Sequence, residues 1–166
     1  MDEKSLVKSA KAGDKDAFCD LYALYKDRLY RYAYYKLGNA EDAQDAVQDC
    51  IVSAYVQMKN IRNASAFSSW IFSILHATCT KYVKLQIKQR ENKSLESTNL
   101  IFNFNQESHE LLSVLEQLNQ DEQDIILLSI VAGFTSKEIS KVMDITPGSV
   151  RSKLSRSLAK MRNILE

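Results

Sequence analysis

Residues 135–156, TSKEISKVMDITPGSVRSKLSR, carry the signals of two short helices joined by a tight turn. Thr135 is followed three residues later by a glutamate, the pattern of a capping box in which each side chain satisfies an N–H of the first turn. Asp144 stands where the chain must turn, and Asp tolerates the left-handed conformation better than most residues. Thr146 and Pro147 start a second helix, since Thr caps it and Pro fits its first position. The stretch therefore predicts a helix-turn-helix.

The second helix of this pair is predicted to have one apolar and one basic face. The residues expected to point inward at helical spacing are Val150, Leu154, Leu158 and Met161. Those expected to point outward are Ser149, Ser152, Lys153 and Arg156, with Arg151 on the flank. Residues 134–162 hold seven Lys and Arg against two acids, an excess that phosphate contact requires. A basic helix of this kind fits a major groove, and the alternative is a helical hairpin with a solvated basic face.

Composition favours a helical protein. The chain has 166 residues with one Pro, four Gly and 45% hydrophobic residues, which fits helices with few elaborate loops. The net charge is only +1, so any affinity for nucleic acid must come from local patches. The N-terminus lacks an apolar signal region and no apolar run is long enough to span a membrane, so we expect a cytoplasmic protein without membrane insertion.

Neither a cofactor nor a catalytic site is expected. Cys19, Cys50 and Cys79 are widely spaced, with no CxxC pair or histidine cluster, which argues against a zinc site. Each lies beside apolar residues, so all three are interpreted as small core residues. The sequence contains no legible nucleophile–base constellation, no obvious carboxylate pair and no glycine-rich phosphate loop. The chain is therefore not expected to be an enzyme.

The hydrophobic pattern predicts an all-α fold of two small helical domains. After a short first helix that ends before Gly13, helical stripes are expected over 14–37, 40–59 and 67–88. Residues 89–109 are polar and lack a helical period, which is typical of a flexible linker. Helical patterning resumes at residue 110 and leads into the helix-turn-helix. The predicted domains are therefore 1–88 and 110–166.

The first domain is predicted to have two charged faces of opposite sign. Asp42, Asp45 and Asp49 share one helix face beside Gln48, in a segment without Lys or Arg. Such a face is either solvated or a docking site for a basic protein. Residues 59–88 have cations but no acid, with aromatic residues between them. That combination suits single-stranded nucleic acid, although a place in the core fits Trp70 better, because it lies next to Phe67, Ile71 and Ile74.

Three segments, in this order, resemble the extracytoplasmic-function group of bacterial sigma factors. EDAQDAVQD at 41–49 is similar to the polymerase-binding helix of that family. FSSWIFSI at 67–74 is similar to the aromatic segment that precedes the promoter-melting helix. Residues 133–154, with PGSVRSKL at their end, are similar to the C-terminal helix-turn-helix. The C-terminal motif alone would also fit response-regulator activators, but the three segments at this spacing are more specific.

The resemblance implies an alternative sigma factor that binds core RNA polymerase and promoter DNA and is restrained by an anti-sigma factor. It assigns the polymerase contact to Asp42, Asp45, Gln48 and Asp49. It assigns the −35 element to Thr146, Ser149, Arg151, Ser152, Lys153 and Arg156. It assigns the −10 element to the helix over 70–84, with Trp70, Ser73, His76, Ala77, Lys81 and Lys84. The family commonly has an Arg-Asn pair at His76 and Ala77 and an acid at Lys81, so the preferred −10 sequence is expected to be unusual.

Two other functions fit parts of the sequence. A helix-turn-helix regulator would act without binding core polymerase, with the first domain as a sensor or dimerisation module. A helical adaptor would use its basic faces to bind acidic proteins. Neither alternative requires the acidic face over 41–49, which favours the sigma factor.

Overall fold

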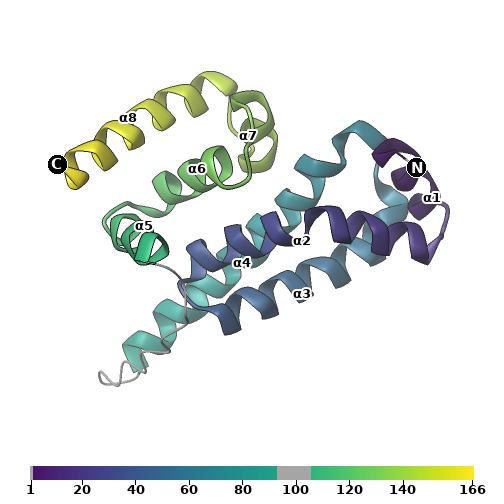
Figure 1. Ribbon diagram of the computed structural model, residues 1–166, viewed down its shortest axis with the longest axis horizontal. Coiled ribbons are helices and arrows are strands. Elements are labelled where there is room, and N and C mark those ends of the chain that lie inside the picture. Colours follow the sequence, from purple (N-terminus) through teal and green to yellow (C-terminus); the bar gives the residue numbers. More distant parts are fainter. Residues whose placement is uncertain (1, 93–105) are drawn as a thin grey trace.

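The computed structural model describes residues 2–92 and 106–166, and every regular element in those ranges is a helix (Figure 1). The all-α fold predicted from the sequence is confirmed. The elements, in chain order, are α1 Glu3–Lys11, α2 Lys15–Leu37, α3 Ala40–Gln57, the short 3₁₀ turns η1 Met58–Asn60 and η2 Ala64–Ala66, α4 Phe67–Asn92, α5 Gln106–Glu116, α6 Gln120–Ile130, α7 Ser136–Met143 and α8 Pro147–Leu165.

The first half of the chain is built on three long helices, α2, α3 and α4, with α1 packed at one end (Figure 1). Polar caps fix where they start: the Asp14 carboxylate accepts from the N–H groups of α2, and the Asn39 side chain accepts from Asp42 N at 2.8 Å. Gly38 ends α2 at φ 81°, a left-handed conformation that glycine adopts without penalty. Large side chains from α2 and α4 fill the interior, among them Leu21, Leu29, Tyr32, Phe67, Phe72 and Leu75, and they pack against smaller buried residues of α3.

The helix-turn-helix has the predicted start and turn signals. Thr135 and Glu138 form a complete capping box, with N–H to oxygen distances of 3.0 and 3.2 Å. Asp144 ends α7 in the left-handed region at φ 56°. The Thr146 hydroxyl accepts from Ser149 N at 3.1 Å, and Pro147 is the first residue of α8. Local capping chemistry therefore sets the turn between these helices.

The buried face of α8 differs from the prediction by one residue. Ser157 is fully buried, whereas Leu158, which was expected to face inward, is 40% exposed. The Ser157 hydroxyl donates to Lys153 O at 2.7 Å, so its polarity is satisfied within the helix and costs little on burial. A small side chain at this position also allows α8 to pack closely on α6.

Two other sequence predictions need correction. Cys19 is exposed, while Cys50 and Cys79 are buried as expected. α4 continues to Asn92 and α5 begins at Gln106, so helices extend into both ends of the predicted linker, and residues 93–105 of that linker lie outside the described residues. The sequence predicted an earlier end because residues 89–92 lack apolar periodicity. In the structure they continue α4 beyond Val83, the last residue of its buried stripe.

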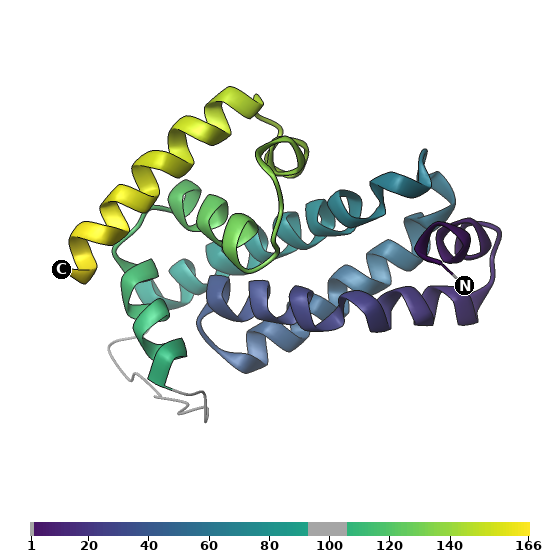
Figure 2. The same ribbon diagram turned by 45° about the horizontal axis from the view of Figure 1, so that its top comes forward.

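The two halves of the chain pack against each other. α7 lies on α4 and α6 lies on α2, while α6 separates α8 from the long helices (Figure 2). The ring of Phe72 in α4 meets Phe134, just before α7, edge to face at 4.9 Å. The Arg28 guanidinium on α2 donates to the carbonyl of Ala132 at 3.4 Å. Both aromatic and polar contacts therefore join the halves.

Candidate protein-docking and nucleic-acid surfaces

The acidic face of α3 is partly engaged by the neighbouring helix α4. The Gln86 side-chain amide donates to Asp42 Oδ2 at 2.7 Å, and the Tyr82 hydroxyl donates to Asp49 Oδ2 at 2.7 Å. Burial and the hydrogen bond to Asp49 raise the pKa of Tyr82, so its hydroxyl remains a donor. Asp45 lies exposed between these two tied carboxylates.

The predicted protein-docking residues divide into two groups. Asp45 and Gln48 are exposed and carry no described side-chain bond, so they are available to a partner. Asp49 is exposed although Tyr82 holds it, whereas Asp42 is half-buried and also accepts from the Asn39 amide at 3.1 Å. We infer that Asp42 mainly fixes the start of α3 against α4.

An apolar strip continues the acidic face toward the end of α3, and the sequence analysis missed it. Val52 and Val56 are 60% and 65% exposed, and Tyr55 beside them is 47% exposed. Val52 and Val56 follow Asp45 and Asp49 at helical spacing, so acids and valines share one face. The sequence did contain a signal for this strip. Helix α3 has apolar residues outside its buried stripe, more than a helix with a single buried face needs.

Five of the six predicted −10 residues share one face of α4. Trp70, Ser73, Ala77, Lys81 and Lys84 follow one another at helical spacing. The last three are exposed, and Lys88 continues the same face. Trp70 is half-buried and lies 5.8 Å from Phe67, so it belongs partly to the core, and the Ser73 hydroxyl donates to Ser69 O at 2.8 Å. The face is therefore basic along its second half and aromatic at its start.

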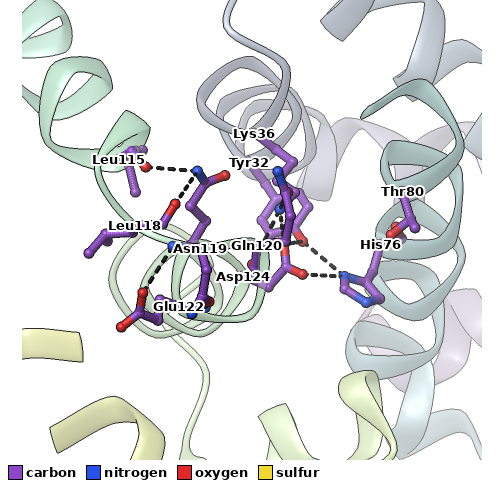
Figure 3. Close-up of polar contacts among 11 residues, drawn as sticks. Tyr32, Lys36, His76, Thr80, Leu115, Leu118, Asn119, Gln120, Glu122 and Asp124 are labelled. Atoms are coloured by element: carbon purple, nitrogen blue, oxygen red, sulfur yellow. Dashed lines mark hydrogen bonds and ion pairs between the residues drawn. The ribbon is translucent and has the colours of Figure 1, made fainter. Parts of the chain in front are cut away.

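His76 points away from that face toward the second half of the chain. Its Nδ1 lies 3.2 Å from the Tyr32 hydroxyl and 3.9 Å from Asp124 Oδ2 (Figure 3). Asp124 belongs to α6, so the histidine is at the contact between the halves. The structure does not place His76 with the other five residues.

The basic face of α8 is also divided between free and engaged side chains. Ser149, Arg151, Ser152 and Arg156 are exposed, and the Arg156 Nε donates back to Ser152 O at 3.4 Å. Lys153 is half-buried and lies 3.4 Å from the Asp121 carboxylate at the start of α6. Lys160 forms a similar pair with Glu122 at 3.1 Å. The α8 cations nearest α6 therefore stabilise the packing of these two helices.

The described residues offer no site for a metal ion. No group of three or more His, Cys, Asp or Glu side chains within 2–92 and 106–166 is arranged to hold one. Among the same residues, no helix is long and apolar enough to cross a membrane.

Comparison with known proteins gives two family matches in the order found in the sequence. Residues 21–87 match the model of sigma-70 region 2, which runs from within α2, through α3, to within α4. Residues 108–161 match the model of sigma-70 region 4, which covers the helix-turn-helix. The first match contains both the acidic and the basic face of the first half.

Relatives and solved structures match over nearly the whole chain. The sigma factor SigW of Bacillus subtilis is 26% identical over 98% of this chain and 96% of its own length. The sigma-E factor of Haemophilus influenzae is 26% identical over 99% of this chain and 95% of its own length. Both are named as extracytoplasmic-function RNA polymerase sigma factors.

Two solved structures share the fold. CnrH, in complex with the cytosolic domain of CnrY, is 22% identical with a TM-score of 0.81, over 98% of this chain and 96% of its own. RpoE of Bartonella quintana, in complex with the anti-sigma factor NepR, is 20% identical with a TM-score of 0.77, over 92% of this chain and 98% of its own. From its two matched regions and its relatives aligned over nearly their whole length, the chain belongs to the sigma-70 family of RNA polymerase sigma factors, in the extracytoplasmic-function group.

Proposed function

We propose that this protein is an alternative sigma factor that binds core RNA polymerase and directs it to a specific set of promoters. The observation that carries this function is the order of the two matched regions, each with a charged helix face suited to a different partner. The protein acts by binding, and we assign it no catalytic residue and no cofactor. Because its partners are the transcription machinery and the chromosome, it works in the cytoplasm.

The α3 face is our proposed polymerase contact. Asp45, Gln48 and Asp49 present exposed acceptors to a basic partner surface, which gives orientation and fast association. The apolar strip of Val52 and Val56 adds area that water leaves on binding. Asp42 supports the face by holding α3 in position, through its bonds to Asn39 and Gln86.

The exposed face of α4 is our proposed −10 contact. Ala77, Lys81 and Lys84 would follow the strand backbone, and strand opening requires a base to leave the stack and enter a pocket. Trp70 and Ser73 at the start of the face supply an aromatic surface and a hydroxyl. His76 and Ala77 stand where the family commonly has Arg and Asn, so we expect a different base preference at the melted position.

The α8 face is our proposed −35 contact. Ser149, Ser152 and Arg156 lie along the exposed side of α8, with Arg151 on its flank. An Arg on such a helix can read guanine with two hydrogen bonds, while Ser and Thr side chains or Lys can bind phosphate. Thr146 caps the helix whose N-terminus approaches the DNA, and Lys153 contributes if it leaves Asp121.

An anti-sigma factor is the proposed regulator. The solved structure of RpoE of similar fold contains an anti-sigma factor, and this chain has an acidic and a basic face that one protein could cover. Residues 1–88 and 110–166 are the proposed functional domains, with the segment between them as a linker.

Duplex binding with and without polymerase tests this function. Fluorescence anisotropy would follow a pool of labelled promoter fragments titrated with the protein, with core bacterial RNA polymerase, and with both. We expect weak binding by the protein alone and strong sequence-selective binding when both are present. Tight selective binding by the protein alone would indicate a regulator, and binding without any sequence preference in either case would indicate an adaptor.

A further inference from the structure

A buried cluster of charged and polar side chains lies between the two halves of the chain (Figure 3). The Lys36 ammonium on α2 is 2.6 Å from Asp124 Oδ1 on α6, and both side chains are nearly excluded from water, at 2% and 8% exposure. Lys36 also donates to the Gln120 side chain at 2.5 Å and to the Gln120 carbonyl at 3.4 Å. All of these acceptors belong to α6.

The partners of Asp124 come from the other half in the same way. Besides Lys36, the carboxylate accepts from the Tyr32 hydroxyl on α2 at 3.5 Å and lies 3.9 Å from His76 on α4. Tyr32 is fully buried, and burial and Asp124 together raise its pKa, so it remains a donor. Every described polar partner of this ion pair therefore crosses the contact between the halves.

From this cluster we infer that Lys36 and Asp124 form an intramolecular latch that holds the protein in a closed state in which it cannot engage both promoter elements. This inference rests on the proposed function for the roles of α4 and α8. The latch itself is a property of the free protein and can be tested without polymerase.

In the closed state the two proposed DNA-binding faces are too close together to reach both promoter elements. Phe72 and Phe134 touch across the halves, and Phe72 is next to Ser73 on the proposed −10 face. The path from Phe134 through α7 to Ser149 limits the separation of Ser73 and Ser149 to at most about 55 Å, at 1.5 Å per helical residue and up to about 3.6 Å elsewhere. Elements named −35 and −10 lie about 25 base pairs apart, or about 85 Å at 3.4 Å per pair. The halves must therefore separate on a promoter.

A charged contact is suited to such a release. A buried ion pair gains little net stability over separated, hydrated ions, because desolvation offsets most of the attraction. Separation of the halves returns water to both Lys36 and Asp124, so the ion pair adds little to the cost of opening, whereas apolar contacts across the same seam, such as Phe72 with Phe134, lose their hydrophobic contribution. Removal of one partner is different, since it leaves the other charge buried and unpaired in the closed state only. Single substitutions should therefore favour the open state.

The open fraction can be measured by energy transfer in the full chain. Cys19 is exposed at the start of α2, and Asn163→Cys adds a second exposed thiol on α8. Cys50 and Cys79 are fully buried, and burial raises the pKa of the Cys50 thiol to about 12, so dyes would label only the two exposed sites. The transfer efficiency then reports on the separation of the halves.

Asp124→Asn and Lys36→Met should each lower the closed-to-open ratio at least about tenfold, because each leaves one buried charge unpaired. The matched control is Asp121→Asn, which makes the same change on the same helix but removes only the Lys153 pair within the second half. It should leave the transfer efficiency unchanged. Circular dichroism would establish that each variant keeps its helices, and agreement between substitutions on opposite sides of the contact would exclude a local folding defect.

The double variant Lys36→Met with Asp124→Leu should shift the closed-to-open ratio in the opposite direction, toward the closed state. Replacement of a buried ion pair by apolar side chains is commonly neutral or stabilising, so the halves should stay closed and open less readily. Because only the open fraction binds both partners, the apparent affinity for core polymerase on a promoter should rise up to about tenfold in the single variants. It should fall in the double variant.

Two results would overturn the inference. Equal transfer efficiency in Asp124→Asn, Lys36→Met and the Asp121→Asn control would mean that the pair does not hold the halves together. A clear opening without any gain in polymerase-dependent promoter binding would mean that the closed state is not inhibitory. If the unmodified protein bound no polymerase at all, the proposed function would fail, and the energy-transfer result would still decide whether the latch exists.

Discussion

The exposed faces of α3 and α8 have opposite charge but are built in the same way. On α3, Asp49 is tied to Tyr82 of a neighbouring helix, while Asp45 is free. On α8, Lys153 is tied to Asp121 of a neighbouring helix, while the hydrogen bond of Arg156 to a described residue is to Ser152 O in its own helix. In both cases helical spacing gathers the charges on one face, and tertiary neighbours decide which of them remain available.

The two faces differ in what surrounds the free charges. The acidic face of α3 continues into exposed valines, a combination of charge and apolar area that suits a protein partner. The basic face of α8 is bordered by serines, which suits phosphates and base edges. From this difference we expect substitutions on the α3 face to impair polymerase binding and substitutions on the α8 face to impair promoter choice.

The largest expected effect is at the acidic face. Asp45→Lys with Asp49→Lys should reduce affinity for core polymerase on the order of 100-fold or more, because a basic partner would then meet like charge. Titration of labelled protein with core polymerase measures this directly. Asp45→Lys alone should account for most of the loss, because Asp45 is exposed whereas Asp49 is already held by Tyr82. This single substitution also leaves the Tyr82–Asp49 bond intact.

The matched control reverses two exposed acids on α2, Asp20 and Asp27, to Lys. It changes the net charge by the same amount without touching α3. Equal loss in the control and in the α3 variant would reduce the effect to general charge repulsion and remove the docking assignment.

The next effect separates the free from the tied cation on α8. Arg156→Ala should cost about 1–3 kcal/mol of promoter binding, confined to changes at particular −35 positions, if the guanidinium reads a base. Lys153→Ala should cost less and affect all sequences equally, because its charge already serves Asp121. Binding to a set of −35 substitutions at several salt concentrations distinguishes the two. A larger, sequence-selective loss for Lys153→Ala would reverse their roles.

A smaller effect concerns the support of the acidic face. Tyr82→Phe removes the hydroxyl that donates to Asp49 and should lower the free energy of unfolding by about 1 kcal/mol. Urea unfolding measures the change, with Tyr55→Phe as the comparison. The Tyr55 hydroxyl has no hydrogen bond within the described residues, so its removal should have almost no effect. Equal changes in both variants would show that the Tyr82 bond does not support α3.

The smallest effect is a pH dependence at the start of α6. Glu122 accepts from Asn119 N at 2.9 Å, and this bond, with the nearby Lys160, holds the pKa of the carboxyl below its ordinary value. A lowered folded pKa contributes stability above the unfolded pKa, near 4.5, and that stability is lost as pH falls through the folded pKa. Glu122→Gln should therefore unfold a few tenths of a kcal/mol more easily at pH 7, roughly the size of a charge effect at a helix N-terminus, and match the parent once the pH is below the lowered folded pKa. A difference that persists at low pH would contradict this cause.

Local signals in the sequence were enough to predict most of the fold. The capping residues Asp14, Asn39, Thr135 and Thr146 start helices where predicted, because caps act within one turn of the chain. On the inward face of α8 one position was predicted wrongly, since hydrophobicity favours Leu158 over Ser157, whereas Val150 is buried as predicted. Only the packing against α6 reveals that the serine satisfies its own hydroxyl.

The candidate site was less predictable than the fold. The spacing of Asp42, Asp45 and Asp49 gives one helix face, but the bonds that tie Asp42 and Asp49 to α4 depend on residues more than thirty positions away. Lys36 and Asp124 are separated by most of the chain, and each alone resembles a surface charge at the edge of an apolar stripe. Their pairing depends on how the two halves dock, which no local pattern encodes.

Transcription on a library of randomised promoter templates would show whether this protein directs core RNA polymerase to specific promoters. Purified protein would be added to core bacterial RNA polymerase, and the start sites of all transcripts would be sequenced. We expect specific transcripts that require both components, with shared sequences near −35 and −10 upstream of each start. No component-dependent transcripts, despite sequence-specific duplex binding by the protein alone, would contradict this expectation and leave the acidic face of α3 merely solvated.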